Sequence, residues 1–367
     1  MRILQIYDHA GISSGIVSVI MSWHRSNLLE DVKFDFLFTK KIKPSYEEEI
    51  LNCGGEVFYI DDIEENSSVF TFIKKVNKFF EKNAYRYDGV HLHSANFAFP
   101  YLYFAKKYGI PLRILHVHSV AFGNNLLSGI RNIPLIYFNR FLANSFIACS
   151  TNAAKTWFGL LGISNFEIIP NPLEVEKYGQ NMDIRREVRS QLNIKDDTII
   201  LGHVSNMTPL KEVPFIIDVL DRLRQDGFEC KLVLIGKDVL PATVKDKINI
   251  YNLEKEVINL GVRSDIDMVL HAIDVCLMPS KSEGFGMVPL ECQAADVPVI
   301  ISKNFPKEIK ASEKVSVLER DVELWSSEVV KMLPKRFVSN NLNNLKFNFS
   351  LQTVVPKLYK FYHRITE

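Results

Sequence analysis

The residues best suited to chemistry lie in one short stretch that holds two glutamates and two glycines. Glu283 and Glu291 are separated by seven residues, and Gly284, Phe285 and Gly286 follow the first of them. The glycines let a ligand approach the backbone closely, and the carboxylates can accept hydrogen bonds from ligand hydroxyls. Because two glutamates at this spacing also arise by chance, the prediction of a site depends on the surrounding sequence.

That surrounding sequence predicts a strand, a turn and the start of a helix. The apolar run Val275–Met278 precedes the glycines, and Pro289 follows them. Proline is tolerated in the first helical turn, so Pro289 places free backbone N–H groups near Gly286, Met287 and Val288. Such a helix start suits a phosphate or a sugar hydroxyl, and we expect a ligand of this kind here.

Four further segments place glycine, histidine, asparagine or lysine directly after apolar strands. They are Asp8–Ile16 with Gly11 and Gly15, Ile114–Ser119 with His118, the turn-rich Ile168–Pro172, and Gly202–Lys211 with Asn206 and Lys211. Taken singly, these segments are weak signals, because a strand-end histidine is more often structural and G-x-x-x-G is not the dinucleotide fingerprint. His91 and His93 lack carboxylate or cysteine partners at ligand spacing and do not indicate a metal site.

Together, the order and spacing of the five elements resemble family 4 of the glycosyltransferases, and within it the bacterial capsule and exopolysaccharide enzymes. These are retaining enzymes of the GT-B class, and the resemblance extends over most of the chain. It implies an α/β fold of two doubly wound, Rossmann-like domains facing across a cleft. It also implies transfer of a hexosyl group from a nucleotide-sugar donor, UDP-linked, to a lipid-linked saccharide acceptor, with no metal and no other cofactor.

The resemblance further implies a role for each matched residue. Lys211, the backbone at Gly15 and the helix start after Gly286 would balance the charge of the departing diphosphate. Glu283 would hold the donor sugar as a positioning group, not as a glycosidase-type nucleophile. Glu291 would hold the ribose. The predicted catalytic residues are His118, Lys211 and Glu283, and the predicted donor-binding residues are Gly15, Asn206, Lys211, Arg263, Glu283, Gly284, Phe285, Gly286, Met287, Val288 and Glu291.

One residue departs from the family pattern in a way that affects the chemistry. Asn206 stands where the family usually has arginine, five residues before Lys211. A neutral amide cannot make the same bidentate, charge-assisted contact to a diphosphate. Either another base compensates, with Arg263 and His203 as candidates, or donor binding is weakened, or catalysis has been lost.

Composition excludes several classes of protein. The chain has 367 residues, is 47% hydrophobic and 24% charged, and carries a net charge of +1. This balance gives no bulk argument for binding nucleic acid. Five widely spaced cysteines suggest neither a disulfide framework nor a zinc knuckle and fit a reducing cytoplasm. No apolar run is long enough to span a membrane.

The near-neutral total conceals a basic region. Residues 89–166 contain no Asp or Glu, whereas 43 acidic residues in 367 would place about nine in this stretch, and it carries six Lys and Arg. Within it, residues 126–142 are apolar with spaced arginines, a composition that suits an anionic lipid surface. The alternative is a core helix with solvated basic edges. We expect a cytoplasmic protein that attaches peripherally to the inner face of the cell membrane through this region.

Strands alternate with amphipathic helices along the whole chain, as in βαβ units. We predict a first domain over residues 1–170 that binds the acceptor and a second over 171–349 that binds the nucleotide sugar. A terminal helix over 350–367 would pack back on the first domain. The predicted strands are 3–7, 34–38, 57–60, 89–93, 113–118, 146–149, 167–169, 199–204, 231–235, 257–260, 275–278, 297–301 and 315–318.

Two other functions compete with a transferase. Asn206 motivates a non-catalytic GT-B subunit that binds saccharide or stabilises a partner transferase. A nucleotide-sugar epimerase of the same architecture is the second alternative, although the motifs match the transferases more closely. Product analysis with and without an acceptor separates these possibilities.

Overall fold

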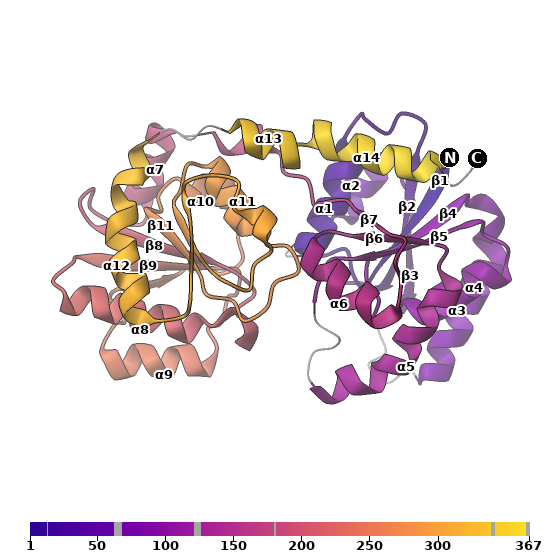
Figure 1. The fold of residues 1–367 in the computed structure, drawn as a ribbon, viewed down its shortest axis with the longest axis horizontal. Helices are drawn as coiled ribbons and strands as arrows, with labels where there is room; N and C mark the ends of the chain where they lie inside the picture. The colour runs from indigo at the N-terminus through magenta and orange to yellow at the C-terminus, as the bar shows by residue number, and fades with distance from the viewer. Residues whose placement is uncertain (13, 62–67, 121–125, 180, 339–341, 365–367) are drawn as a thin grey trace. The chain divides into compact units, whose positions relative to one another are not determined.

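A computed structural model describes residues 1–12, 14–61, 68–120, 126–179, 181–338 and 342–364 (Figure 1). The chain divides into two compact units, each considered by itself. Unit 1 comprises Met1–Pro172 and Leu351–Glu367, and unit 2 comprises Leu173–Ser350. The first division lies two residues from the one expected at residue 170.

Unit 1 is built on a seven-stranded parallel sheet in the order β3-β2-β1-β4-β5-β6-β7. Its strands are β1 (Arg2–Tyr7), β2 (Lys33–Lys40), β3 (Val57–Asp61), β4 (Gly89–Leu92), β5 (Leu112–Val117), β6 (Ser145–Ala148) and β7 (Glu167–Ile168). Its α-helices are α1 (Gly15–Arg25), α2 (Glu47–Asn52), α3 (Val69–Asn83), α4 (Ala98–Lys107), α5 (Leu126–Leu142), α6 (Thr151–Leu161) and α14 (Leu351–Arg364).

Unit 2 is built on a six-stranded parallel sheet in the order β10-β9-β8-β11-β12-β13. Its strands are β8 (Ile199–Val204), β9 (Cys230–Ile235), β10 (Val257–Asn259), β11 (Val275–Met278), β12 (Val299–Ser302) and β13 (Val315–Leu318). Its α-helices are α7 (Met182–Gln191), α8 (Val213–Gln225), α9 (Ala242–Tyr251), α10 (Ile266–Leu270), α11 (Met287–Ala294), α12 (Val322–Met332) and α13 (Asn343–Phe349). Short 3-10 turns, among them η2 (Val175–Tyr178) and η3 (Pro209–Lys211), complete the unit.

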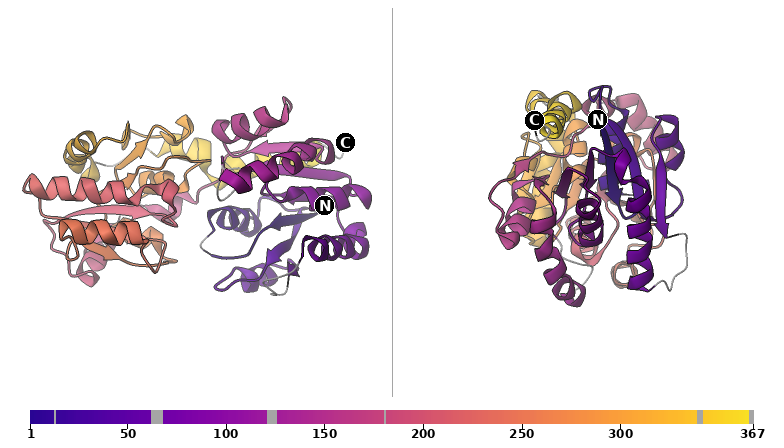
Figure 2. Two further views of the ribbon diagram at one scale, coloured as in Figure 1. Left: turned by 90° about the horizontal axis from the view of Figure 1, so that it is seen from below. Right: turned by 90° about the vertical axis from the view of Figure 1, so that its right-hand side faces the viewer.

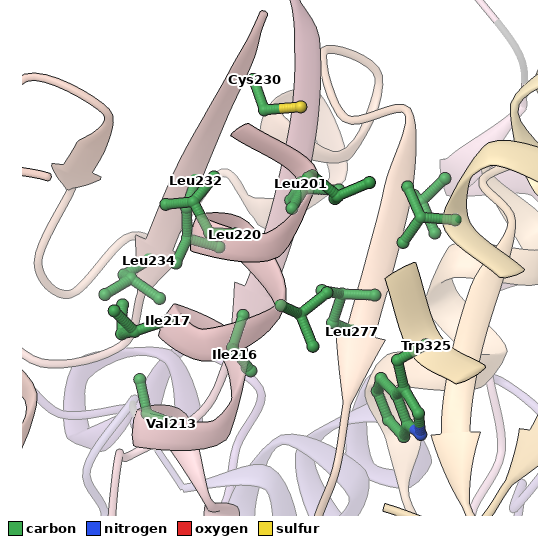
Figure 3. Close-up of a cluster of buried hydrophobic side chains, with 14 of the residues drawn as sticks. Leu201, Val213, Ile216, Ile217, Leu220, Cys230, Leu232, Leu234, Leu277 and Trp325 are labelled. Carbon is green, nitrogen blue, oxygen red and sulfur yellow. The ribbon is translucent and has the colours of Figure 1, made fainter. Parts of the chain in front are cut away.

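Helices cover both faces of each sheet (Figure 2), which explains why several strands are mostly apolar runs rather than alternations of apolar and polar residues. In unit 2, one face of α8 packs on the sheet through Val213, Ile216, Ile217 and Leu220 (Figure 3). All four side chains are at most 1% exposed. The predicted doubly wound α/β fold is confirmed, and every predicted strand matches an observed strand to within two residues at each end.

The C-terminal helix α14 belongs to unit 1. Val354, Val355, Leu358 and Tyr362 recur at helical spacing and are completely buried. The Tyr362 hydroxyl reaches the sheet, where it lies 2.7 Å from Nδ1 of His91 on β4. The last helix of the chain therefore contacts polar groups of the central strands.

The polar stretch after the first division forms helix α7, where no helix was predicted from the sequence. Its buried side chains include Arg185 and Arg189, whose guanidinium groups bind the carboxylate of Asp274 at 2.5 and 3.3 Å. Both also donate to the carbonyl of Ala272. Charge pairing fixes this helix where apolar periodicity would normally do so.

Candidate active site

The candidate site of unit 2 lies where β8 and β11 end. These strands are neighbours in the sheet, so the loops that follow them lie side by side. The N–H of Lys281 in the second loop donates to the carbonyl of Leu210 in the first at 2.8 Å. In doubly wound sheets, ligands bind at the carboxyl ends of the strands.

A short ion pair joins the two loops. Nζ of Lys211 lies 2.6 Å from Oε1 of Glu283, and the two side chains are 21% and 10% exposed. The structure thus brings together two of the three predicted catalytic residues. An ammonium and a carboxylate so placed can face a ligand that presents both an anionic group and hydroxyl groups.

Helix α11 begins beside this pair, as the strand, turn and helix pattern predicts. Gly286, the N-cap residue directly before α11, has φ +97°, and a Cβ there would lie 2.6 Å from the Phe305 ring. Because glycine has no capping side chain, it leaves the N–H groups of Met287 and Val288 to other partners. Gly284 and Phe285 are buried, so the Phe285 side chain of this turn packs inside the unit.

Glu291 lies in the second turn of α11, against η2. The Tyr178 hydroxyl donates a hydrogen bond to its carboxylate, and Lys177 and Asp267 lie close enough to influence it. Burial raises the pKa of Glu291 to about 7, an effect that Lys177 and Tyr178 oppose and Asp267 increases. Tyr178 is a site residue that the sequence reasoning missed, because nothing in the sequence pairs it with α11.

Asn206 is exposed at the start of the loop that carries Lys211, and its Oδ1 accepts from the Thr208 N–H at 3.4 Å. Neither proposed substitute for the missing arginine occupies this loop as a cation. Arg263 follows β10, with β9 between it and β8, and binds Asp265 at 2.5 Å. His203 is completely buried, and burial lowers its pKa to about 4, so it is neutral.

The structure reveals another cation that the sequence reasoning did not single out. Lys281 is two residues before Glu283, and its Nζ lies 2.5 Å from Oε1 of Glu212, the residue directly after Lys211. Arg320 also binds the Glu212 carboxylate. Lys281 was visible in the motif, but only the strand order places it against the Lys211 loop.

The two remaining predicted residues lie in unit 1. Gly15 is the first residue of α1, and a Cβ there would meet no atom within 4 Å, which leaves space for a ligand. Ser13 of the same loop lies outside the described residues. His118 follows β5 and is 8% exposed. Its Nδ1 lies 3.1 Å from Oδ1 of Asn171, and its Nε2 lies 3.0 Å from Nδ1 of His93.

His93 connects His118 to a buried group of histidines. Ring nitrogens of His91, His93 and His116 lie within 4.8 Å of one another, the arrangement of a possible metal site. The rings of His91 and His93 are nearly parallel, at 25°, and those of His91 and His116 at 15°. Because imidazole lone pairs lie in the ring plane, the stacked rings of His91 and His93 do not aim their lone pairs at one point. His91 Nε2 instead lies within hydrogen-bond distance, 3.1 Å, of Nδ1 of His116.

Within the basic region 89–166, helix α5 carries an exposed aromatic surface. Tyr137, Phe138 and Phe141 are 43%, 53% and 56% exposed. The Arg140 guanidinium lies over the Tyr137 and Phe141 rings, at 5.3 and 5.2 Å from their centroids. Residues 121–125 and the side chain of Arg131 lie outside the described residues. None of the described helices is long and apolar enough to cross a bilayer.

Two Rossmann-like units, each built on a parallel sheet, are the architecture of the GT-B class of glycosyltransferases. The family description Glycosyltransferase Family 4 matches residues 32–177, and that of Glycosyl transferases group 1 matches residues 184–333. The chain belongs to family 4 of the GT-B glycosyltransferases, as its motifs predict.

Known proteins similar to this chain include one from Bacillus subtilis (strain 168) assigned as the glycosyltransferase EpsF. It is 28% identical over 96% of this chain and 94% of its own. The Escherichia coli UDP-Gal:alpha-D-GlcNAc-diphosphoundecaprenol alpha-1,3-galactosyltransferase is 24% identical over 79% of this chain and 76% of its own. Among solved structures, Anabaena HepE in complex with UDP and glucose has a TM-score of 0.79 at 18% identity over 98% of both chains. The glycosyltransferase WaaG, involved in lipopolysaccharide biosynthesis, has a TM-score of 0.76 at 13% identity, covering 98% of this chain and 99% of its own.

Proposed function

We propose that this protein transfers a hexosyl group, with retention and without a metal, from a UDP-sugar to a lipid-linked saccharide in the synthesis of a capsule or exopolysaccharide. The observation that carries the proposal is the Lys211–Glu283 pair beside the start of α11. The name of the E. coli relative supports the substrate classes, because it specifies a UDP-sugar donor and a diphosphoundecaprenol-linked acceptor. The UDP complex of HepE, which shares the fold, agrees with a uridine nucleotide.

The proposed division of work follows from residue chemistry. Lys211 and the N–H groups of Met287 and Val288 stabilise the negative charge that grows on the leaving diphosphate. Glu283 accepts hydrogen bonds from donor sugar hydroxyls, and Glu291 accepts them from the ribose. An acceptor hydroxyl oxygen bonds to the anomeric carbon on the face that the diphosphate leaves. Its proton passes to a phosphate oxygen of the leaving group. Because the new bond forms on the face from which the diphosphate departs, the anomeric configuration is retained.

A donor panel tests this proposal. Nucleotide sugars are incubated with a polyprenyl-diphosphate-linked saccharide, and nucleoside diphosphate release and product linkage are measured. We expect turnover with one UDP-sugar and an α-linked product from an α-linked donor. Binding of donors without turnover across the whole panel would overturn the enzyme proposal, and a β-linked product would overturn retention.

A matched pair of variants tests the site itself. Lys211→Ala should lower turnover by at least about 100-fold, the scale expected for losing an oriented charge in a transition state. Lys247→Ala is the control, because Lys247 forms a similar pair with Asp218 at 2.5 Å and the two are 27% and 23% exposed. Equal effects of the two substitutions would remove Lys211 from the reaction.

The acceptor side involves helix α5. We propose that its exposed aromatic side chains and Arg140 rest on the anionic inner face of the cell membrane. In sedimentation with anionic liposomes, Phe138→Ser should weaken binding, and Tyr85→Ser, at an 86% exposed aromatic of the same unit, should not. Binding that is absent at low salt, or equal in the two variants, would refute this surface.

One observation favours a second candidate, a non-catalytic GT-B subunit. Asn206 is neutral, so Lys211 is the one cation among the described residues of its loop. Saturable donor binding without turnover, together with increased activity of a second transferase in the presence of this protein, would establish that alternative.

A further inference from the structure

A continuous chain of hydrogen bonds crosses the interior of unit 1 from Asn171 to His116. Its members are Asn171, His118, His93, Gln5, Tyr362, His91 and His116. They come from β1, β4, β5 and α14, from the residues directly after β4 and β5, and, for Asn171, from the segment after β7. All seven side chains are at most 8% exposed. Water therefore has little access, and each proton position depends on its neighbours in the chain.

One arm joins the side chains of Gln5 and Asn171. His93 Nε2 lies 2.7 Å from Oε1 of Gln5, His93 Nδ1 lies 3.0 Å from Nε2 of His118, and His118 Nδ1 lies 3.1 Å from Oδ1 of Asn171. If both amide oxygens accept, these three hydrogen bonds require three protons on two imidazoles. The pair would then carry a buried positive charge.

The environment opposes that charge. Burial lowers the pKa of His118 to about 4 and lowers the pKa of His93 well below its ordinary value. Both rings are therefore neutral at physiological pH and share two protons. One of the two terminal amides must then be turned to present its NH2 group, because amide oxygen and nitrogen are assigned from their hydrogen bonds.

The other arm decides which amide turns. Tyr362 lies 3.3 Å from the Gln5 amide and 2.7 Å from Nδ1 of His91, and His91 Nε2 lies 3.1 Å from Nδ1 of His116. Nε2 of His116 has no hydrogen-bond partner in the part of the chain that the structure describes.

Turning Asn171 would make every donor point toward His116 and leave a buried N–H without an acceptor. Turning Gln5 reverses the direction and leaves a bare nitrogen lone pair at the same place. Orphaned buried N–H groups are rare in proteins and more unfavourable than an unused acceptor.

We propose that Gln5 is turned with its NH2 group toward His93, so that the whole chain holds its four histidines in the Nδ1–H tautomer. His93 Nδ1–H then donates to His118 Nε2, and His118 Nδ1–H donates to Asn171. The Tyr362 hydroxyl donates to Gln5 Oε1 and accepts from His91 Nδ1–H. Gln5, His93 and Tyr362 are positioning residues that decide which nitrogen of His118 carries the proton.

The consequence for transfer rests on the proposed function. A substrate oxygen that displaces Asn171 would meet an N–H group of His118, so His118 would donate a hydrogen bond and not act as a base. In the opposite direction of the chain, the same position would present a lone pair. The tautomers themselves do not depend on any activity.

Histidine labelled with ¹⁵N in the ring allows a direct test in the full-length protein without substrate. Long-range ¹H–¹⁵N spectra at pH 7.5 distinguish the two neutral tautomers and the imidazolium, and single histidine substitutions assign the signals. We expect His91, His93, His116 and His118 all to carry Nδ1–H. An Nε2–H tautomer or a doubly protonated ring at any of the four would overturn the proposal.

Two variants test the connection. Tyr362→Phe removes the acceptor of His91 Nδ1–H and should shift the tautomer signals of His91 and His116. Tyr359→Phe on the same helix, whose hydroxyl binds Asp31, is the control and should leave them in place. Unchanged signals in Tyr362→Phe would refute a link through this hydroxyl.

Gln5→Glu supplies two acceptor oxygens of the same shape and should place a proton on Nε2 of His93. If His93 keeps a bare Nε2 in this variant, the Gln5 side chain does not determine which nitrogen of His93 carries the proton, and its proposed role as a positioning residue is wrong. If the wild-type protein shows no glycosyl transfer but the four histidines have the expected tautomers, the proposed function is refuted and the inference about the tautomers still holds.

Discussion

The pH dependence of donor binding should be governed by Glu291. Its pKa, raised to about 7 by burial, lies inside the physiological range, whereas the pKa values of His118 and His203 are lowered to about 4. In the proposed donor complex, the ionised carboxylate is the form that would accept hydrogen bonds from both ribose hydroxyls. If only this form binds the donor well, the apparent Kd scales with one plus the ratio of protonated to ionised carboxyl.

That ratio gives the magnitude. With a pKa of about 7, the factor is about 11 at pH 6 and about 1.1 at pH 8, so donor affinity should rise about tenfold over two pH units. Calorimetric titration with a UDP-sugar measures it, because the diphosphate of a sugar nucleotide has no proton that titrates in this range. Glu291→Gln should bind with an affinity that hardly changes with pH.

Glu319→Gln is the control, since it removes a carboxylate of unit 2 that is 68% exposed and should keep the wild-type slope. Affinity of the wild-type protein that is constant between pH 6 and 8 would refute the reasoning. The same tenfold slope in Glu291→Gln would assign the titration to another group.

The same shift determines how stability depends on pH. The folded pKa of Glu291, about 7, lies above its ordinary value of 4.5, so the folded state binds more protons between these values. The contribution of Glu291 to the free energy of unfolding therefore falls as pH rises through this window, by at most about 3 kcal/mol. Urea unfolding of the full chain should show this fall in the wild-type protein and a smaller one in Glu291→Gln. A wild-type stability that instead rises from pH 5 to 7, relative to Glu291→Gln, would contradict the raised pKa.

Three further substitutions test other parts of unit 2. Gly286→Ala should destabilise the protein by about 1–3 kcal/mol and weaken donor binding, because its φ is +97° and the new Cβ would meet Phe305 at 2.6 Å. Thermal unfolding measures the loss of stability, and the control Gly159→Ala, whose Cβ would meet no atom within 4 Å, should not lower stability. Asn206→Arg should raise donor affinity by about tenfold, the value of one charge-assisted contact, and titration that shows no gain would place this position away from the diphosphate. Asp274→Ala should cost about 3–5 kcal/mol by leaving two buried guanidinium groups without their carboxylate, and an unchanged urea midpoint would refute that estimate.

Much of the fold could be predicted because parallel strands buried on both faces appear as short apolar runs. Val275–Met278 is such a run, and Val299–Ile301 within β12 is another. Helix α7 could not be predicted, because its position depends on Arg185 and Arg189 binding Asp274, which is far away in the sequence. Hydrophobic periodicity does not predict an ion pair between residues that are far apart in the sequence.

The candidate site was predictable to the same extent. Residues within one strand, turn and helix, such as Glu283 and Gly286, could be placed from local order alone. Contacts across neighbouring strands could not, since they depend on the sheet order that sets Lys281 against the Lys211 loop. Tyr178 is the same case, because only the fold brings η2 to α11.

The loop that carries Lys211 is held in shape before any donor arrives. Met207 and Glu212, on either side of its turn, have φ of +52° and +53°, a region unfavourable for side chains of this size. The Met207 N–H donates to Ser205 Oγ at 3.0 Å, and the Glu212 carboxylate is bound by Lys281 and Arg320. These contacts offset strain of about 1–3 kcal/mol at each residue. Since the backbone is already fixed, a donor in the proposed reaction would have only to draw the Lys211 ammonium away from Glu283 for this cation to meet the leaving phosphate with little reorganisation.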